Sequence, residues 1–279
     1  MKILKKLYWA FVLAFLYMPI FVMIAFSFNQ SKSRTVWTGF TLKWYVELFK
    51  NEAIIKAFFT TLIVAVIAAT VATVLGTIAA VGIDAMKNWE KSLVINISYM
   101  PVVNPDIITG ISLMLMFVFV GRMMGAATSL NFLTLLIAHV TFCTPYVILQ
   151  VLPKLQQMDK SLPEAAMDLG CTPIGAFLKV ELPEILPGII TGAIMAFTLS
   201  LDDFVISYFT SGNGFETLPI RIYGMTKKTV TPKMYALATI IFFVTLTLLL
   251  ISNFVDNEDS RQLKEIKKKK KHKKMEEKK

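Results

Sequence analysis

The chain has 279 residues and a formal net charge of +10, and 55% of its residues are hydrophobic while only 17% are charged. A soluble domain carries about 25% charged residues, so this composition excludes an ordinary soluble globular protein. The hydrophobic residues gather in long blocks, and blocks of about 18 or more residues indicate membrane-spanning helices. We therefore predict a polytopic, all-α membrane protein.

Six transmembrane helices are predicted within residues 1–255. The first follows Lys2, Lys5 and Lys6. It is too long for a signal peptide and no small-residue cleavage site follows it, so we expect an uncleaved span. The expected spans are residues 7–28, 54–83, 93–120, 131–152, 187–210 and 235–255. The third contains Pro101 and Pro105, which lack backbone donors, so we expect a kink or a break there.

The C-terminal tail, residues 256–279, holds Arg261 and ten lysines. Its low complexity and charge predict a disordered segment. Cytoplasmic loops carry an excess of lysine and arginine, and the tail tips the balance of loop charges toward a cytoplasmic N-terminus. With an even number of spans, both termini of this cell-membrane protein are expected in the cytoplasm. The tail can attract anionic lipids or serve only as a solvated orientation signal. It lacks the aromatic residues that stack on nucleic acid.

Neither the cysteines nor the histidines indicate a metal or catalytic site. Cys143 and Cys171 lie in different segments, without the spacing of metal ligands or of a redox pair. His139 lies inside the fourth span, where we interpret it as a residue of a helix contact. We expect no metal and no catalytic residue in this chain.

The segment between the fourth and fifth spans, residues 153–183, carries signals for two short helices on the cytoplasmic side. Ser161 and Glu164 have the S-x-x-E spacing of a capping box, which predicts the start of the first helix. Gly170 is placed to end it, as glycine commonly does at a helix C-terminus.

The second short helix of this segment begins after the glycine. Thr172 is predicted to cap it, with Pro173 as its first residue, and Pro183 is expected to stop it. The residues alone leave open whether this hairpin contacts another protein or only its own bundle.

The hairpin also resembles the signature loop of ABC importer permeases. That pattern reads Glu-Ala-Ala, three residues, Gly, nine residues and Ile-x-Leu-Pro. Six residues of this chain fall on it, and Val180 stands in for the isoleucine: Glu164, Ala165, Ala166, Gly170, Leu182 and Pro183. The resemblance implies that the hairpin docks on a cytoplasmic ATPase and transmits its closure to the membrane helices.

Other segments resemble the spermidine/putrescine permease subfamily, and most of all its second permease subunit type. Examples are "MPVVNPDIITGISL" in the third span and "AFTLSLDDFVISYFTSG" in the fifth. The resemblance implies a type I ABC importer permease bundle with a coupling helix hairpin. It also implies four kinds of partner: an ATPase dimer, a second homologous permease, an extracellular binding protein and a polyamine substrate. The basic tail is not part of the pattern.

This chain contains no G-x-x-x-x-G-K-[ST] phosphate loop. We therefore expect a transport subunit rather than an enzyme, with no cofactor of its own. ATP and Mg²⁺ would bind to a separate ATPase.

Three acids lie inside predicted spans: Asp106, Asp202 and Asp203. Each costs roughly 2.5–3.5 kcal/mol at the centre of a membrane helix, so such residues usually face a bundle interior or an aqueous path. Neighbouring helical positions point about 100° apart, so Asp202 and Asp203 cannot face the same way. We predict that Asp202 faces the substrate path and that Asp203 bonds to a neighbouring helix or subunit. Asp106 either lines the path or holds the break together.

Aromatic faces attract ammonium groups, so Tyr223 is a candidate for the outer mouth of the path. A tyrosine at this depth can equally be an interfacial anchor.

Three alternatives remain open at this point. The first keeps an ABC importer and changes its cargo to iron, another cation, sulfate or phosphate, although three intramembrane aspartates argue against an anion. The second is a secondary carrier or ion channel whose aspartates relay protons or cations. The third is an intramembrane aspartyl protease, which the absence of a G-x-G-D pattern disfavours. The sequence also leaves open whether spermidine or putrescine is carried, and whether the permease partner is a homologue or a second copy.

Overall fold

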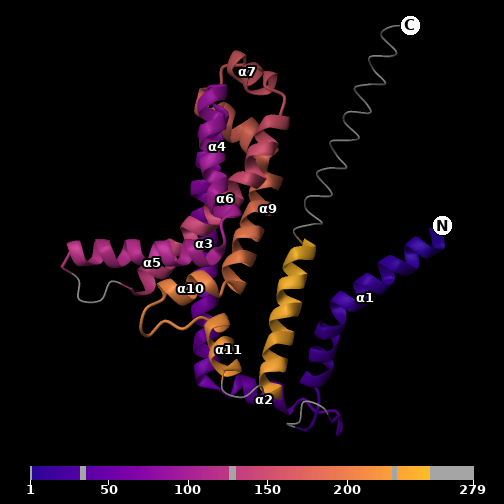
Figure 1. The fold of residues 1–279 in the computed structure, drawn as a ribbon. Coiled ribbons are helices and arrows are strands. Elements are labelled where there is room, and N and C mark those ends of the chain that lie inside the picture. The colour runs from indigo at the N-terminus through magenta and orange to yellow at the C-terminus, as the bar shows by residue number, and fades with distance from the viewer. Residues whose placement is uncertain (1, 32–35, 126–129, 228–230, 252–279) are drawn as a thin grey trace. The chain divides into compact units, whose positions relative to one another are not determined.

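The computed structural model describes residues 2–31, 36–125, 130–227 and 231–251, and these residues form helices joined by turns and loops. One isolated antiparallel bridge joins Asn29 to Phe40. The helices (Figure 1) are α1 Lys2–Ser27, α2 Lys43–Phe49, α3 Glu52–Asp84, α4 Asn88–Val103, α5 Asp106–Met123, α6 Phe132–Gln157, α7 Ser161–Asp168, α8 Pro173–Ala176, a π-helical turn Phe177–Glu181, α9 Leu182–Asp202, α10 Val205–Thr210, α11 Leu218–Thr226 and a last helix Pro232–Ile251. The predicted tail, residues 256–279, lies outside the described residues.

Six of these helices are long and apolar enough to cross a membrane, which confirms the all-α class and the number of spans. They cover Leu4–Ser27, Glu52–Asp84, Asp106–Met123, Phe132–Gln157, Pro173–Asp202 and Pro232–Ile251.

The third predicted span, residues 93–120, is two helices rather than one. Asn104 and Pro105 separate α4 from α5, and both adopt extended backbone, with ψ of 142° and 134°. A proline disfavours helical backbone at the residue before it, which explains why the chain breaks at Asn104. Pro101 stays inside α4. Of the two halves, α5 is the one long and apolar enough to span.

The helix that contains the fifth predicted span, residues 187–210, starts earlier than that span and is interrupted within it. The helical segment begins at Pro173 and runs to Asp202, so Pro183 does not stop the helix. A proline within an α-helix lacks a donor and crowds the carbonyl four residues earlier, and the wider π-helical turn at Phe177–Glu181 accommodates it. At the other end, Asp203 and Phe204 separate α9 from α10.

The described residues divide into two compact units: those within 2–60 and 216–245, and those within 61–215 and 246–251. In the first unit, the indole nitrogen of Trp44 donates a hydrogen bond of 2.7 Å to the carbonyl of Asn29. Trp44 packs in a small core whose other members are Leu48, Ile54, Ala57, Leu218, Ala236 and Leu237. The Nζ of Lys233 lies 2.5 Å from Glu47 and ties the last helix to α2.

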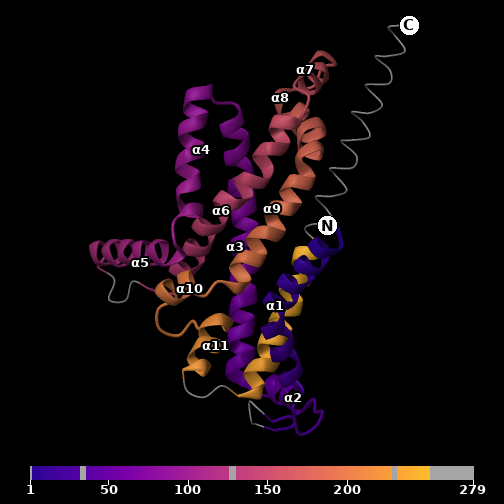
Figure 2. The same ribbon diagram turned by 45° about the vertical axis from the view of Figure 1, so that its right-hand side comes forward.

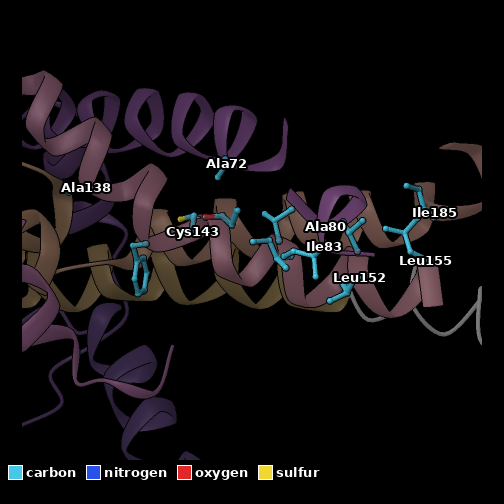
Figure 3. Packing of buried hydrophobic residues seen from close by; sticks show 14 of the residues in the cluster. Ala72, Ala80, Ile83, Ala138, Cys143, Leu152, Leu155 and Ile185 are labelled. Atoms are coloured by element: carbon cyan, nitrogen blue, oxygen red, sulfur yellow. Dashed lines mark hydrogen bonds between the residues drawn. The ribbon is translucent and has the colours of Figure 1, made fainter. Parts of the chain in front are cut away.

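In the second unit, α6 and α9 run side by side (Figures 1 and 2), with α7 at one end of the pair and α10 at the other. The core of this unit draws many of its members from α3 and α6, and many of them are small, as at Ala72, Ala80, Ala138 and Cys143 (Figure 3). Small residues let helix backbones approach closely, which is how helices associate within a membrane.

Two glycines mark the closest approaches to α6. A Cβ at Gly76 of α3 would lie 2.7 Å from the Cβ of Val147. A Cβ at Gly188 of α9 would lie 2.9 Å from the backbone oxygen of Gln150. The second contact involves backbone, so it can be relieved only by moving the helices apart.

We therefore expect Gly188→Ala to destabilise the protein by about 1–3 kcal/mol, the usual cost of overpacking. The measurement is the thermal unfolding midpoint of the detergent-purified protein. The matched control is Gly82→Ala in α3, because a Cβ there meets no atom within 4 Å and alanine is the better helix former. Equal midpoints for the two variants would contradict this account of the α6–α9 contact.

Candidate transport site and coupling hairpin

The interruption between α9 and α10 is built around Asp203. Its backbone is extended, with ψ of 126°. Its carboxylate accepts hydrogen bonds from the backbone N–H groups of Ile206, at 3.2 Å, and Ser207, at 2.7 Å. These N–H groups have no partner within their own helix because they lie in its first turn. Asp203 therefore caps α10, and its side chain is only 6% exposed.

His139 of α6 reaches both sides of this interruption. Its Nδ1 lies 2.7 Å from the hydroxyl of Ser200, which precedes the break. Its Nε2 lies 2.9 Å from the hydroxyl of Ser207, which follows the break, and 3.6 Å from the carboxylate of Asp203. The sequence interpretation of His139 as a helix-contact residue agrees with this position, but the partners Ser200 and Ser207 were not assigned to it. The sequence does carry a signal for these partners, because Ser200 and Ser207 are seven residues apart and would share one helical face with Asp203.

The other two predicted acids are exposed and lie beside the two interruptions. Asp202 is the last residue of α9, next to Asp203, and it is exposed, whereas the side chain of Asp203 is buried. Asp106 occupies the first turn of α5, where a negative charge is favoured by the helix dipole. Thus each interruption has a carboxylate at the start of its second helix, Asp106 in one and Asp203 in the other.

The two interruptions lie close together because α5 and α10 pack on each other. A Cβ at Gly110 of α5 would lie 3.1 Å from the ring of Phe209 and 3.5 Å from the carbonyl of Val205. No local pattern in the sequence predicts this contact between α5 and α10.

Tyr223 lies on α11, which belongs to the first unit. The ammonium group of Lys227 lies over its ring, with Nζ 4.6 Å from the ring centroid. The ring is therefore able to hold an ammonium group, as expected of an aromatic face.

The first half of the hairpin, α7, ends as predicted at Gly170, which has φ of +90°. The N–H of Gly170 donates to Met167, and the N–H of Cys171 donates to the carbonyl of Ala166. This pair of bonds is the Schellman arrangement, in which glycine is favoured because it adopts positive φ without strain.

The start of α7 differs from the prediction. The capping box of Ser161 and Glu164 does not form, since no side chain caps this end through a hydrogen bond of that kind. The carboxylate of Asp159 instead accepts from both the N–H and the hydroxyl of Ser161, at 3.2 and 2.7 Å. An aspartate two residues earlier competes for the same donors.

The second half of the hairpin begins as predicted. The hydroxyl of Thr172 accepts from the N–H of Gly175 at 3.1 Å, and Pro173 is the first residue of α8. From there the chain passes through the π-helical turn into α9, with Leu182 half-buried and Pro183 exposed.

The hairpin presents uncovered apolar side chains. Leu169 is 87% exposed and Ile174 is 73% exposed, and they flank Gly170. Glu164 and Ala165 are also exposed, while Ala166 is half-buried. A cluster of exposed apolar residues on an otherwise polar segment is typical of a protein-interaction site.

Comparison with solved structures shows the same fold in ABC importers. A bacterial ABC transporter involved in the import of the acidic polysaccharide alginate aligns with a TM-score of 0.70 at 17% identity, over 93% of this chain and 94% of that one. An amino acid ABC transporter aligns with a TM-score of 0.55 at 20% identity, over 79% of this chain and 99% of that one.

Relatives with closer sequences are permeases. The putrescine transport system permease protein PotI of Escherichia coli is 44% identical over 81% of each chain. The spermidine/putrescine transport system permease protein PotC of Haemophilus influenzae is 37% identical over 92% of this chain and 98% of its own length. Residues 72–261 match the family described as the binding-protein-dependent transport system inner membrane component. With six apolar helices and this match, the chain is a multi-pass membrane protein that belongs to the family of binding-protein-dependent transport system inner membrane components.

Proposed function

We propose that this chain is a permease subunit of an ATP-driven ABC importer for polyamines, with putrescine and spermidine as substrates. The observation that carries the proposal is the 44% identity to a putrescine permease over 81% of both chains. The likeness to the alginate importer supports the fold alone, because only 17% of the residues are identical.

The intramembrane acids support a cationic cargo. Asp106 and Asp202 are exposed carboxylates beside the two helix interruptions, and a carboxylate within a membrane is costly unless it meets water or a positive partner. Polyamines carry an ammonium group at each end and require spaced negative charges. Among the three predicted acids, Asp202 is the stronger candidate for substrate contact, because Asp203 is engaged in capping α10. Tyr223, on the first unit, is a separate candidate contact for an ammonium group, because aromatic faces attract cations.

The hairpin of α7 and α8 supports coupling to a separate ATPase. Its exposed apolar residues Leu169 and Ile174 flank the glycine turn, and their burial in a groove of a partner would be favourable. The hairpin continues into the membrane helix α9, so movement of the docked hairpin is passed directly to that span. ATP and Mg²⁺ bind to the ATPase, and this chain catalyses no covalent step.

The complete importer contains an ATPase dimer, this permease, a second homologous permease and an extracellular binding protein that delivers the cargo. Closure of the ATPases on nucleotide shifts the permease pair from an inward-facing to an outward-facing population, because nucleotide binds the closed form better. The lysine-rich tail favours a cytoplasmic C-terminus, and six spans place the N-terminus and the hairpin on the same side of the cell membrane.

The first test is transport by the complete complex in reconstituted vesicles. We expect ATP-dependent uptake of labelled putrescine or spermidine. We also expect Asp202→Asn to slow it about tenfold, since loss of one charge-assisted contact worth about 1.4 kcal/mol changes binding by that factor. Asp106→Asn and Asp203→Asn are measured in parallel.

Uptake that needs no ATP and follows a proton gradient would overturn the importer and favour a secondary carrier. Uptake of sulfate, phosphate or iron in place of polyamines would overturn the cargo only. Normal polyamine transport by all three asparagine variants would remove the acids from the substrate path.

The second test concerns docking of the hairpin. We expect Leu169→Glu to abolish co-purification of the ATPase, because a carboxylate cannot be buried cheaply in an apolar groove. The unfolding midpoint of the isolated permease should not change, since this side chain is 87% exposed. Leu169→Met is the matched control, because it keeps an apolar side chain of similar size. Glu164→Lys and Gly170→Val extend the test to the family pattern, and retention of the ATPase by all these variants would refute the docking role.

A further inference from the structure

The interrupted helix α9–α10 is fastened to α6 at several levels. The thiol of Cys143 lies 3.4 Å from the carbonyl of Ala196 in α9. At the far end, the hydroxyl of Thr134 donates to the carbonyl of Thr210 in α10 at 2.9 Å. Between these two contacts lies His139, and it alone among them touches both halves of the interrupted helix.

The imidazole is suited to bridging because its two nitrogens point in different directions. A neutral ring has one N–H donor and one acceptor, and a serine hydroxyl can serve as either. The carboxylate of Asp203, 3.6 Å from Nε2, favours the tautomer with the proton on that nitrogen. Nε2–H then donates to Ser207, and the hydroxyl of Ser200 donates to Nδ1. Both contacts are satisfied by one neutral side chain that is 1% exposed.

The bridge also determines how the two adjacent aspartates diverge. Ser207 receives His139 on its hydroxyl and gives its backbone N–H to Asp203. The imidazole therefore holds the first turn of α10 where the Asp203 carboxylate can cap it. With Asp203 turned inward, Asp202 is the acid left exposed at the break.

We propose that His139 is a positioning residue for transport: its ring joins the two halves of α9–α10 and thereby keeps Asp202 presented to the cargo. The proposal rests on the proposed function, because it takes Asp202 to be the acid that meets the substrate.

Two replacements of His139 cut the bridge on opposite sides. Asparagine is short and places its amide near the position of Nδ1, so His139→Asn keeps the Ser200 contact and loses the Ser207 contact. Glutamine is longer and reaches toward the position of Nε2, so His139→Gln does the reverse. Ser207→Ala gives a milder cut without changing the histidine. Thr141→Val is the control on α6, because the hydroxyl of Thr141 bonds only within its own helix.

The first measurement reports the position of α10 without reference to any cargo. Ile206 of α10 is fully buried, so a cysteine placed there by Ile206→Cys, in a Cys171→Ser background, should react slowly with N-ethylmaleimide in the purified complex. We expect His139→Asn to raise the labelling rate at least fivefold and Thr141→Val to leave it unchanged.

The second measurement is polyamine uptake in vesicles by the complete complex. We expect His139→Asn, His139→Gln and Ser207→Ala each to slow uptake at least threefold, with subunits still co-purifying. In the Asp202→Asn background the same changes should slow uptake no further, because His139 acts through Asp202. Such non-additivity identifies residues that work as one unit, and general destabilisation would not produce it.

The outcomes separate this inference from the proposed function. If the wild-type complex imports no polyamine, the proposed function fails, and the labelling rates still decide whether His139 holds the break. If labelling is unchanged in His139→Asn, the bridge does not hold α10 and the inference is overturned. If labelling rises while uptake stays normal, or if the losses multiply with Asp202→Asn, His139 is structural only and the positioning role is overturned.

Discussion

The constraint on which the rest of this structure depends is that backbone groups at a helix end cannot be left without partners away from water. In a bilayer each unsatisfied group costs several kcal/mol, so an interrupted helix survives only where other groups supply the missing bonds. Here Asp203 supplies two acceptors to the first turn of α10, and Thr134 supplies a donor to its last turn. Backbone groups at both ends of α10 thus have hydrogen-bond partners. The interruption is therefore a stable place for an exposed acid such as Asp202.

Helix α6, which contacts both sides of the interruption, also organises the second unit. Close approaches at Gly76 and Gly188 bring α3 and α9 against α6, and its polar side chains at Thr134, His139 and Cys143 fix the register of α9 and α10. Packing by small residues allows the backbones to be near, and only then can short polar side chains reach across. A single helix therefore carries both the apolar contacts and the directional ones.

Helix α9 connects the hairpin, where the ATPase is proposed to dock, with Asp202, which is proposed to meet the cargo. At one end the helix grows out of the hairpin through the π-helical turn at Phe177–Glu181, and at the other it ends at Asp202. In the proposed importer, docking of the hairpin would act on α9, which packs against α6 and ends at the bridged interruption.

The sequence by itself determined the features that neighbouring residues encode: six apolar spans, the break before Pro105, the glycine turn at Gly170 and the cap at Thr172. These depend on proline geometry, on glycine's positive φ and on short-range hydrogen bonds, all of which act within a few residues. It failed where two local signals competed, as when Asp159 displaced the capping box of Ser161 and Glu164, and where a π-helical turn carried the helix past Pro183. Only the tertiary structure decided the break at Asp203 and the bridge of His139 to Ser200 and Ser207, which lie 61 and 68 residues away along the chain. No proline or glycine marks that break in the sequence. The imidazole reaches both serines only through the packing of α6 against α9 and α10, which acts between residues far apart in the chain.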